Sequence, residues 1–167
     1  AVRRRAVVEV LAGRVDLSQA VEVDALAAAT RERFGVPHLV FNSAGVGAGG
    51  LVGETPATEW QWVLGVNLFG VAHGVRAFTP MMLEAASADP GYEGRIVNTA
   101  SMAGLVSPPN MGVYNVSKHG VVAVSYTHLR AHETVLDLVC RLLLEKKKNT
   151  KLNHKVRVHI PTHNNAN

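Results

Sequence analysis

Tyr114 and Lys118 are the two residues of this sequence that are best suited to proton transfer. Four positions apart, they would lie on one face of a helix with adjacent side chains. A phenol ordinarily loses its proton near pH 10 and is a poor base at neutral pH, but a neighbouring cation favours the phenolate. The pair could therefore act as a general acid and base. Taken alone, the spacing equally fits a half-exposed tyrosine beside a solvated lysine.

Ser101 adds weight to the catalytic interpretation. It follows residues 95–99, a short apolar run that predicts a buried strand. Ligands of open α/β sheets bind at the carboxyl ends of the strands. The Ser101 hydroxyl could donate to a substrate carbonyl oxygen and stabilise the negative charge that develops there. A capping serine is the alternative, but the order of strand, serine, loop, tyrosine and lysine indicates a catalytic site.

Asn67 is a polar residue inside an apolar segment that predicts a helix, residues 63–71. Asparagine is disfavoured in helix interiors because its amide competes for backbone hydrogen bonds. Its presence there points to a specific role. An exposed position beside the apolar stripe would explain it as well.

The elements that must position these residues alternate between strand and helix. Strands are expected at 7–15, 37–41 and 95–99, the first interrupted by residues 12–14 and the second buried. Helices are expected from the N-cap Ser18 to Gly35, from Thr55 or Thr58 to about 84, and from about 112. This order predicts an α/β fold with a parallel sheet and crossover helices. The inner face of the first helix is expected to carry Val21, Leu26, Ala29 and Phe34.

Composition excludes several classes of function. The 167 residues, 47% apolar and 18% charged, suffice for one folded domain, and no apolar run reaches the roughly 18 residues of a membrane span. Residues 1–123 hold nine basic and ten acidic residues, a net charge of −1, so the excess of positive charge, +5, resides in 124–167 and no nucleic-acid partner is expected. His128 and His132 precede Glu133 in the wrong order for a zinc helix, so no metal is expected.

Taken together, these motifs resemble those of the classical short-chain dehydrogenases/reductases. The resemblance runs from about residue 7 to 125. It rests on Asp16-Leu17-Ser18, Asn42-Ser43-Ala44-Gly45, Val66-Asn67-Leu68, the strand that ends at Ser101, and Tyr114-x-x-x-Lys118, which occur in the family's order. The resemblance implies an α/β fold with a partial doubly wound, Rossmann-like parallel sheet. The first βαβ unit and the C-terminal strands of that fold would be missing.

The resemblance also implies catalytic roles. Tyr114 would exchange a proton with the alcohol or carbonyl oxygen, and Ser101 would hold that oxygen. Lys118 would bind the nicotinamide ribose and favour the phenolate, and Asn67 would hold a water molecule that completes a proton relay. The activity implied is NAD(P)-dependent interconversion of a secondary alcohol and a ketone by hydride transfer.

The implied cofactor is NAD or NADP, and its binding residues would be spread along the chain. Asp16 and Leu17 would lie near the adenine, Asn42, Ala44 and Gly45 would let the cofactor run close to their strand, and Tyr114 and Lys118 would meet the nicotinamide ribose. The resemblance further implies a small-molecule substrate and a homodimer or homotetramer built on the Asn67 and Tyr114 helices. With its single cysteine, Cys140, the chain suits the reducing cytoplasm.

Two departures from the family bear on this chain. It lacks the T-G-x-x-x-G-x-G turn that binds a pyrophosphate, and the glycines of 45–50, which follow a later strand, are expected to form a flexible loop. From residue 124 the sequence no longer resembles that of the family. Codons for 124–133 and 138–147 reproduce the two ends of a transposase-type sequencing adapter. We therefore expect a partial dinucleotide-binding domain at 1–123 and a non-native tail at 124–167, first helical, through Leu136, Leu138, Val139, Leu142 and Leu143, then disordered.

The fragment itself is expected to be inactive, because the pyrophosphate turn and the covering strands are absent from the sequence. Two alternatives to an enzyme stay open, a non-enzymatic Rossmann-like binding module and a non-functional chimeric reading frame. The intact Ser101, Tyr114 and Lys118 favour the enzyme over the binding module. The sequence fixes neither the substrate nor the choice between NAD and NADP.

Overall fold

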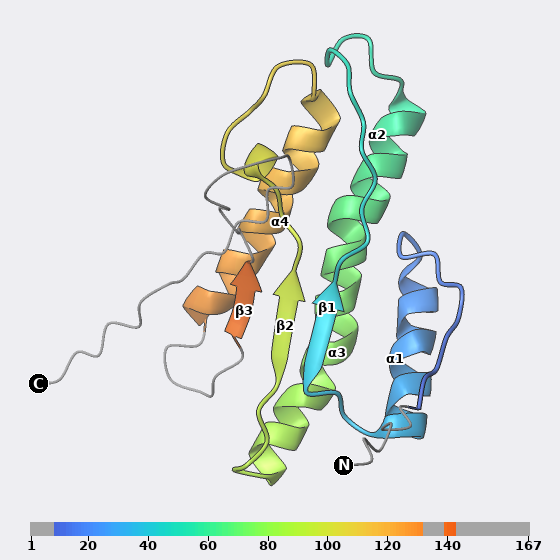
Figure 1. Ribbon diagram of the computed structural model, residues 1–167, viewed down its shortest axis with the longest axis vertical. Coiled ribbons are helices and arrows are strands. Elements are labelled where there is room, and N and C mark those ends of the chain that lie inside the picture. The colour runs from blue at the N-terminus through green and yellow to red at the C-terminus, as the bar shows by residue number, and fades with distance from the viewer. Residues whose placement is uncertain (1–8, 132–138, 143–167) are drawn as a thin grey trace, which may run out of the picture.

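The computed structural model describes residues 9–131 and 139–142 (Figure 1). Three parallel strands form one sheet in the order β1, β2, β3, with Leu39 opposite Arg95 and Arg95 opposite Val139. Their bounds are Leu39–Asn42 for β1, Arg95–Asn98 for β2 and Val139–Leu142 for β3. The predicted α/β fold with a parallel sheet is confirmed.

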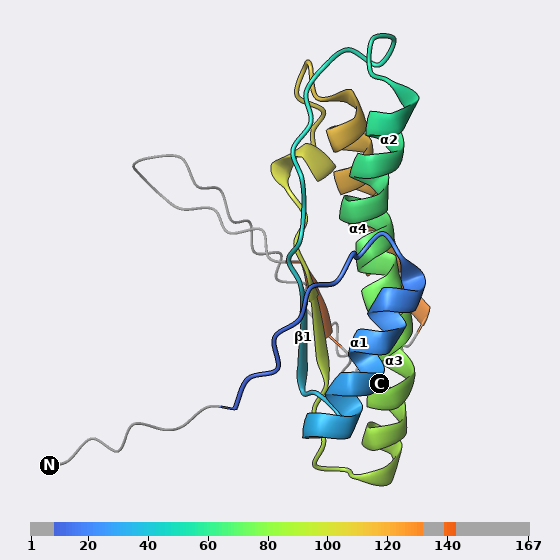
Figure 2. The same ribbon diagram turned by 90° about the vertical axis from the view of Figure 1, so that its right-hand side faces the viewer.

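The helices of the described residues all cover the same face of the sheet (Figure 2). They are α1 (Ala20–Phe34), α2 (Ala57–Leu64), α3 (Gly70–Ala88) and α4 (Gly112–Ala131), with a 3₁₀ turn at Met102–Gly104. Right-handed crossovers between neighbouring parallel strands place their helices on one side. The arrangement therefore corresponds to half of a doubly wound sheet.

A single long rod replaces the second predicted helix. It starts after Pro56, not at Thr55 or Thr58, and runs through α2, a π-helical turn at Gly65–Phe69, and α3. It ends at Ala88, a turn beyond the predicted end near residue 84. The π-helical turn contains Asn67, and such turns occur often at functional sites.

The core lies between the sheet and these helices. Val40 and Ile96 point from the strands toward Val71 and Val75 of α3 and Val121 of α4. Leu39 and Phe41 alternate to the opposite face, where they are 61% and 52% exposed. The strand predicted to be buried at 37–41 is therefore buried on one face only, through Val40, because no described helix covers the second face.

The first helix is shifted from its prediction. Its N-cap is Gln19, because the Ser18 hydroxyl donates to Asp16 Oδ1 instead of capping the helix. The fully buried residues are Val23 and Ala27, whereas Leu26 and Ala29 are only half-buried and the expected Val21 and Phe34 are exposed. Gly35 ends the helix as predicted, with a positive φ of 78° that favours glycine.

Residues 9–15 form no strand, so the described part of the strand predicted at 7–15 is wrong; residues 7 and 8 lie outside the described ranges. Val10 and Leu11 of this segment are exposed. A strand needs a neighbour to accept and donate its backbone hydrogen bonds. Among the described residues 9–131 and 139–142, β1 is the last strand at its edge of the sheet, and no further strand pairs with residues 9–15.

The expectation for the tail is partly wrong. Helix α4 continues beyond residue 124 to Ala131, but Val139–Leu142 form strand β3 where a helix was expected. Pairing with β2 satisfies the peptide groups of an otherwise open sheet edge, and this long-range gain overrides helical periodicity. Leu136, Leu138 and Leu143, and the residues expected to be disordered, lie outside the described ranges. Of the described helices, none has the length and apolar character to cross a membrane.

Candidate active site

Tyr114 and Lys118 lie together on α4, as their spacing predicts. The Lys118 Nζ is 5.7 Å from the centroid of the Tyr114 ring and donates a hydrogen bond of 3.0 Å to the Thr99 carbonyl oxygen. Thr99 directly follows β2, so the ammonium stands at the carboxyl end of the sheet. Lys118 is only 4% exposed, and this burial lowers its pKa. The solvated lysine of the alternative interpretation is thus wrong.

Gly45 leaves space beside this ammonium. A Cβ added there would lie 3.6 Å from Lys118 Nζ and 3.4 Å from Asn67 Oδ1. An ammonium has three N–H donors, and Thr99 accepts one of them. Two of its donors therefore remain available.

Asn67 is fully buried, which excludes the exposed position left open above. Its Oδ1 accepts from the Val46 N–H at 2.7 Å, and its Nδ2 donates to the Val46 carbonyl at 2.9 Å and to Ser117 Oγ at 3.1 Å. The side chain thus fastens the loop after β1 to the π-helical turn and to α4. These bonds explain why an amide is tolerated inside this helix.

Ser117 is a member of the site that sequence reasoning missed. It is fully buried, and its hydroxyl donates to the Tyr114 carbonyl oxygen at 2.7 Å while accepting from Asn67. The chain from Asn67 through Ser117 to Tyr114 couples the π-helical turn to the backbone of the tyrosine. Its only sequence signal is a small polar residue between Tyr114 and Lys118.

Ser101 begins the 3₁₀ turn after β2, and its Oγ accepts a 3.2 Å hydrogen bond from the Ala103 N–H. Because the hydroxyl is the acceptor there, its own O–H remains able to donate. The turn packs tightly on α4, since a Cβ on Gly104 would lie 2.6 Å from the Lys118 carbonyl oxygen. The turn that carries Ser101 is therefore fixed against the helix that carries Tyr114 and Lys118.

The Asn42 side chain forms a hydrogen bond within the protein. Its Nδ2 donates to Asn98 Oδ1 at 2.8 Å, and Asn98 in turn donates to Ser125 Oγ at 3.0 Å. A side chain on Gly74 of α3 would overlap Asn42. Asn42 therefore links both strands to α3 and, through Ser125, to α4. The following Ala44 and Gly45 are exposed at the carboxyl end of β1.

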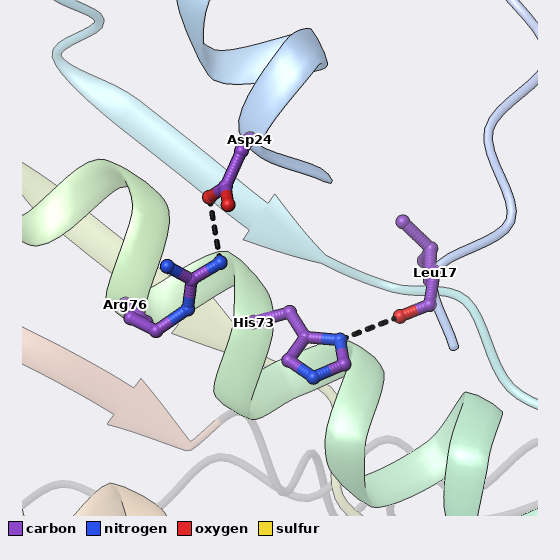
Figure 3. Close-up of polar contacts among 4 residues, drawn as sticks. All are labelled: Leu17, Asp24, His73 and Arg76. Carbon is purple, nitrogen blue, oxygen red and sulfur yellow. Dashed lines mark hydrogen bonds and ion pairs between the residues drawn. The ribbon is translucent and has the colours of Figure 1, made fainter. Parts of the chain in front are cut away.

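Asp16 and Leu17 form a second cluster, apart from the Lys118 group. The exposed Asp16 carboxylate accepts from the Ser18 hydroxyl at 2.8 Å and from the Ser18 N–H at 3.0 Å, and these bonds lower its pKa. The Leu17 carbonyl accepts from His73 Nδ1 of α3 at 3.0 Å (Figure 3). The Arg76–Asp24 ion pair, at 2.6 Å, ties α3 to α1 nearby (Figure 3).

The glycine-rich loop of 45–50 makes backbone hydrogen bonds at its end. The Gly50 N–H donates to the Asn110 carbonyl at 2.8 Å, and the Gly112 N–H donates to the Gly50 carbonyl at 3.3 Å. These bonds join the loop after β1 to the loop that precedes α4. Among the described side chains, no three potential metal ligands come together, and His132 of the metal hypothesis lies outside the described residues.

Comparison with known proteins gives consistent results. The sequence profile of the family described as short chain dehydrogenase matches residues 2–135. A protein of Mycobacterium tuberculosis described as an uncharacterized NAD-dependent oxidoreductase is 39% identical over 119 residues, which are 71% of this chain and 42% of that protein. A CLA biosynthesis dehydrogenase/reductase of Lactiplantibacillus plantarum is 31% identical over 70% of this chain and 39% of its own length.

Solved structures agree with the sequence relatives. A short chain dehydrogenase/reductase from Burkholderia phymatum in complex with NAD is 50% identical, with a TM-score of 0.73, over 78% of this chain and 45% of that one. Levodione reductase is 31% identical with a TM-score of 0.64, over 71% and 44% of the two chains. The chain spans about two fifths of the length of the curated relatives named here.

Proposed function

Because this chain belongs to the short-chain dehydrogenase family, we propose that the protein of which it forms part interconverts a secondary alcohol and a ketone by NAD(P)-dependent hydride transfer. One observation carries the proposal. The buried Lys118 ammonium stands beside the Tyr114 ring at the carboxyl end of β2, with two donors left for a ligand. That is where a parallel α/β sheet binds its ligands.

The residues of the site fit a dinucleotide. The bare backbone at Gly45 admits a ligand next to Lys118, whose remaining donors suit the hydroxyl groups of a ribose. Asp16 and Leu17 would receive the adenine end, and Ala44 and Gly45 would border its path beyond Asn42. When bound, the cofactor supplies the hydride acceptor or donor. NAD and NADP are both compatible with these residues.

The protein's own part in the reaction is proton transfer. During alcohol oxidation the Tyr114 oxygen takes the hydroxyl proton of the substrate, and during ketone reduction it returns that proton to the carbonyl oxygen. The Ser101 hydroxyl, free to donate, holds the same oxygen. Lys118 places its ammonium beside the Tyr114 ring. Asn67 fixes the adjoining loop and holds the water of a proton relay.

The assembly proposed for the whole enzyme is a homodimer or homotetramer. The long rod and α4 pack against each other and expose large apolar side chains, namely Trp62, Phe69 and Val116, each about half exposed. Contacts between copies through these helices would bury that surface. The enzyme would act on a small-molecule substrate in the cytoplasm, without nucleic acid or membrane as a partner.

We also propose that residues 1–123 are the partial dinucleotide-binding domain and that 124–167 are a non-native tail. The codon correspondence on both sides of an index-sized gap supports the proposal. Sequencing across codon 124 in DNA taken directly from the source tests it. A reading frame that departs from this sequence near codon 124 is expected, and an unchanged frame would refute the proposal.

The enzymatic proposal is tested by binding and by turnover. The 167-residue chain is titrated with NADH and with NADPH, and the reading frame recovered from source DNA is assayed for oxidation of secondary alcohols. Tyr114→Phe should abolish turnover and leave cofactor affinity nearly unchanged, whereas Tyr92→Phe, which only removes the hydrogen bond to the Pro37 carbonyl at the opposite end of the sheet, should change neither. Binding without turnover would identify a binding module, and neither binding nor turnover would identify a non-functional reading frame.

A further inference from the structure

His73 makes a directional contact that the proposed reaction does not use. This half-buried residue of α3 lies with Nδ1 3.0 Å from the Leu17 carbonyl oxygen (Figure 3). A carbonyl oxygen only accepts hydrogen bonds, so Nδ1 must carry the hydrogen. The imidazole also stacks on Phe69, with ring centroids 6.3 Å apart and an angle of 22°. The ring is thus held in one orientation, with its donor toward the turn at Leu17.

The turn that His73 holds is otherwise shaped by local bonds. Asp16 accepts from Ser18 through its side chain and from Gln19 through its carbonyl, and the Asp16 N–H donates to Glu22 at 2.7 Å. These partners all lie within six residues. Among the described hydrogen bonds of this turn, the one from His73 joins it to α3.

Two glycines on the surface of the long rod leave room for this turn to pack closely. A Cβ on Gly65 would lie 3.1 Å from the Ser18 Cβ, and a Cβ on Gly70 would lie 3.1 Å from the Leu17 Cβ. Such distances are closer than ordinary van der Waals contact. The two glycines bring the turn onto the rod, and the His73 donor then fixes the direction of the Leu17 carbonyl.

We propose that His73 is a positioning residue for the adenine end of the dinucleotide, acting through the Leu17 peptide. The inference rests on the proposed function, which places Asp16 and Leu17 at the adenine. With its carbonyl fixed by His73, the Leu17 peptide presents the neighbouring Asp16 carboxylate and the 16–18 backbone in one geometry. A nucleotide then meets a preformed turn and loses less free energy in ordering it.

The same rod also positions the other end of the site. Asn67, six residues before His73, fastens the loop beside Gly45 and Lys118. Six helical residues span about 9 Å along the axis. One rigid helix therefore sets the separation between the turn expected at the adenine and the group expected at the nicotinamide ribose.

The test compares two substitutions with a control from the same helix. His73→Leu removes the donor, and His73→Asn restores an N–H close to the position of Nδ1. Arg76→Gln disrupts the ion pair with Asp24 one turn further on and leaves the Leu17 contact intact. The probes are ADP-ribose, which carries the adenine, and reduced nicotinamide mononucleotide, which does not.

The expected result is a loss specific to the adenine probe. His73→Leu should weaken ADP-ribose binding roughly three- to tenfold, the worth of one hydrogen bond, and should speed amide hydrogen exchange at residues 17–19. Mononucleotide affinity should stay unchanged, His73→Asn should recover most of the loss, and Arg76→Gln should lose nothing. The ¹⁵N shifts of the wild-type imidazole should show the Nδ1–H tautomer, a readout that needs no nucleotide.

Four outcomes would overturn the inference. The first is an Nε2–H tautomer of His73, and the second is an ADP-ribose affinity that His73→Leu leaves unchanged. The third is an equal loss in the leucine and asparagine variants, which would indicate general damage to the fold. The fourth is a wild-type protein, made from the reading frame recovered from source DNA, that binds neither probe; it would refute the proposed function and the nucleotide role of His73 together. Unchanged ADP-ribose affinity in His73→Leu would refute the role of His73 alone.

Discussion

Lys118 reaches across from α4 to the strand end, and its Nζ donates to the Thr99 carbonyl oxygen at 3.0 Å. The bond joins the helix of the proton-transfer pair to the strand that leads to Ser101. It also holds a charged group at 4% exposure, where the loss of hydration penalises the ammonium. Such a group lowers the stability of the folded state and remains available to bind a ligand.

The pH dependence of the free energy of unfolding should show the cost of burying the Lys118 ammonium. Burial places the pKa of Lys118 below the ordinary 10.5 of the unfolded chain, so between these two values the unfolded state binds more protons. The free energy of unfolding contributed by Lys118 should therefore rise with pH in that window. Urea unfolding at several pH values below 10 measures the slope, and Lys118→Met should flatten it. A slope equal in both proteins would contradict the prediction. Above pH 10, Tyr92, whose pKa burial raises, contributes in the opposite sense.

Ser18 should control the ionisation of Asp16. The Ser18 hydroxyl and N–H both donate to Asp16 Oδ1 and hold the pKa of that carboxyl below 3.8. Any stability from these bonds is present above pH 3.8 and is lost as the pH falls through the lowered pKa. Ser18→Ala should raise the pKa of Asp16 toward 3.8, as followed by carboxyl carbon shifts in an NMR titration. Ser107→Ala, at an exposed position, should leave it in place.

Removal of the Ser117 hydroxyl should destabilise the site from within. Ser117→Ala deletes the acceptor of the Asn67 amide, in a buried hydrogen bond, and the donor to the Tyr114 carbonyl, in a part-buried one. Leaving buried polar groups without partners costs about 1–3 kcal/mol. Urea denaturation should show a loss of that size for Ser117→Ala and almost none for Ser107→Ala. An equal, small effect of the two substitutions would show that the chain from Asn67 to Tyr114 contributes little.

Gly104 should tolerate no side chain. A Cβ there would lie 2.6 Å from the Lys118 carbonyl oxygen and 2.9 Å from its carbonyl carbon, which are backbone atoms with little freedom to move. Gly104→Ala should therefore cost about 1–3 kcal/mol, as overpacking does, and displace the turn of Ser101. Gly13→Ala, with no atom within 4 Å of its Cβ, is the control. Equal unfolding midpoints for the two variants would argue against the tight packing of the turn on α4.

Prediction from sequence succeeded where local chemistry and long-range packing agree. Residues 95–99 and the helix from Gly112 carry strong apolar patterns, and both lie where they were expected. The spacing of Tyr114 and Lys118 likewise leads directly to their shared face. Motifs with a fixed order gave the family, and the parallel sheet followed from the alternation of elements.

The failures occur where a distant partner decides the local structure. Residues 9–15 have strand composition but pair with no strand among the described residues, and Val139–Leu142 have helical periodicity but join the open edge of β2. Ser18 has the residue type and position of a helix N-cap, yet its hydroxyl donates a hydrogen bond to the Asp16 carboxylate instead. Ser117 and His73 escaped notice because each acts through a partner 50 or more residues away. No local pattern reveals such partners.

The one-sided helix layer has a practical consequence for anyone who handles this protein. Leu39 and Phe41 are exposed on the face of the sheet that no described helix covers. The sheet is therefore amphipathic, with one apolar exposed face and one face covered by helices. We expect such a protein to adsorb at air–water interfaces and on plastic, and its light scattering should rise steeply with concentration. Dilute, surfactant-containing buffers are therefore the conditions under which its individual properties can be measured.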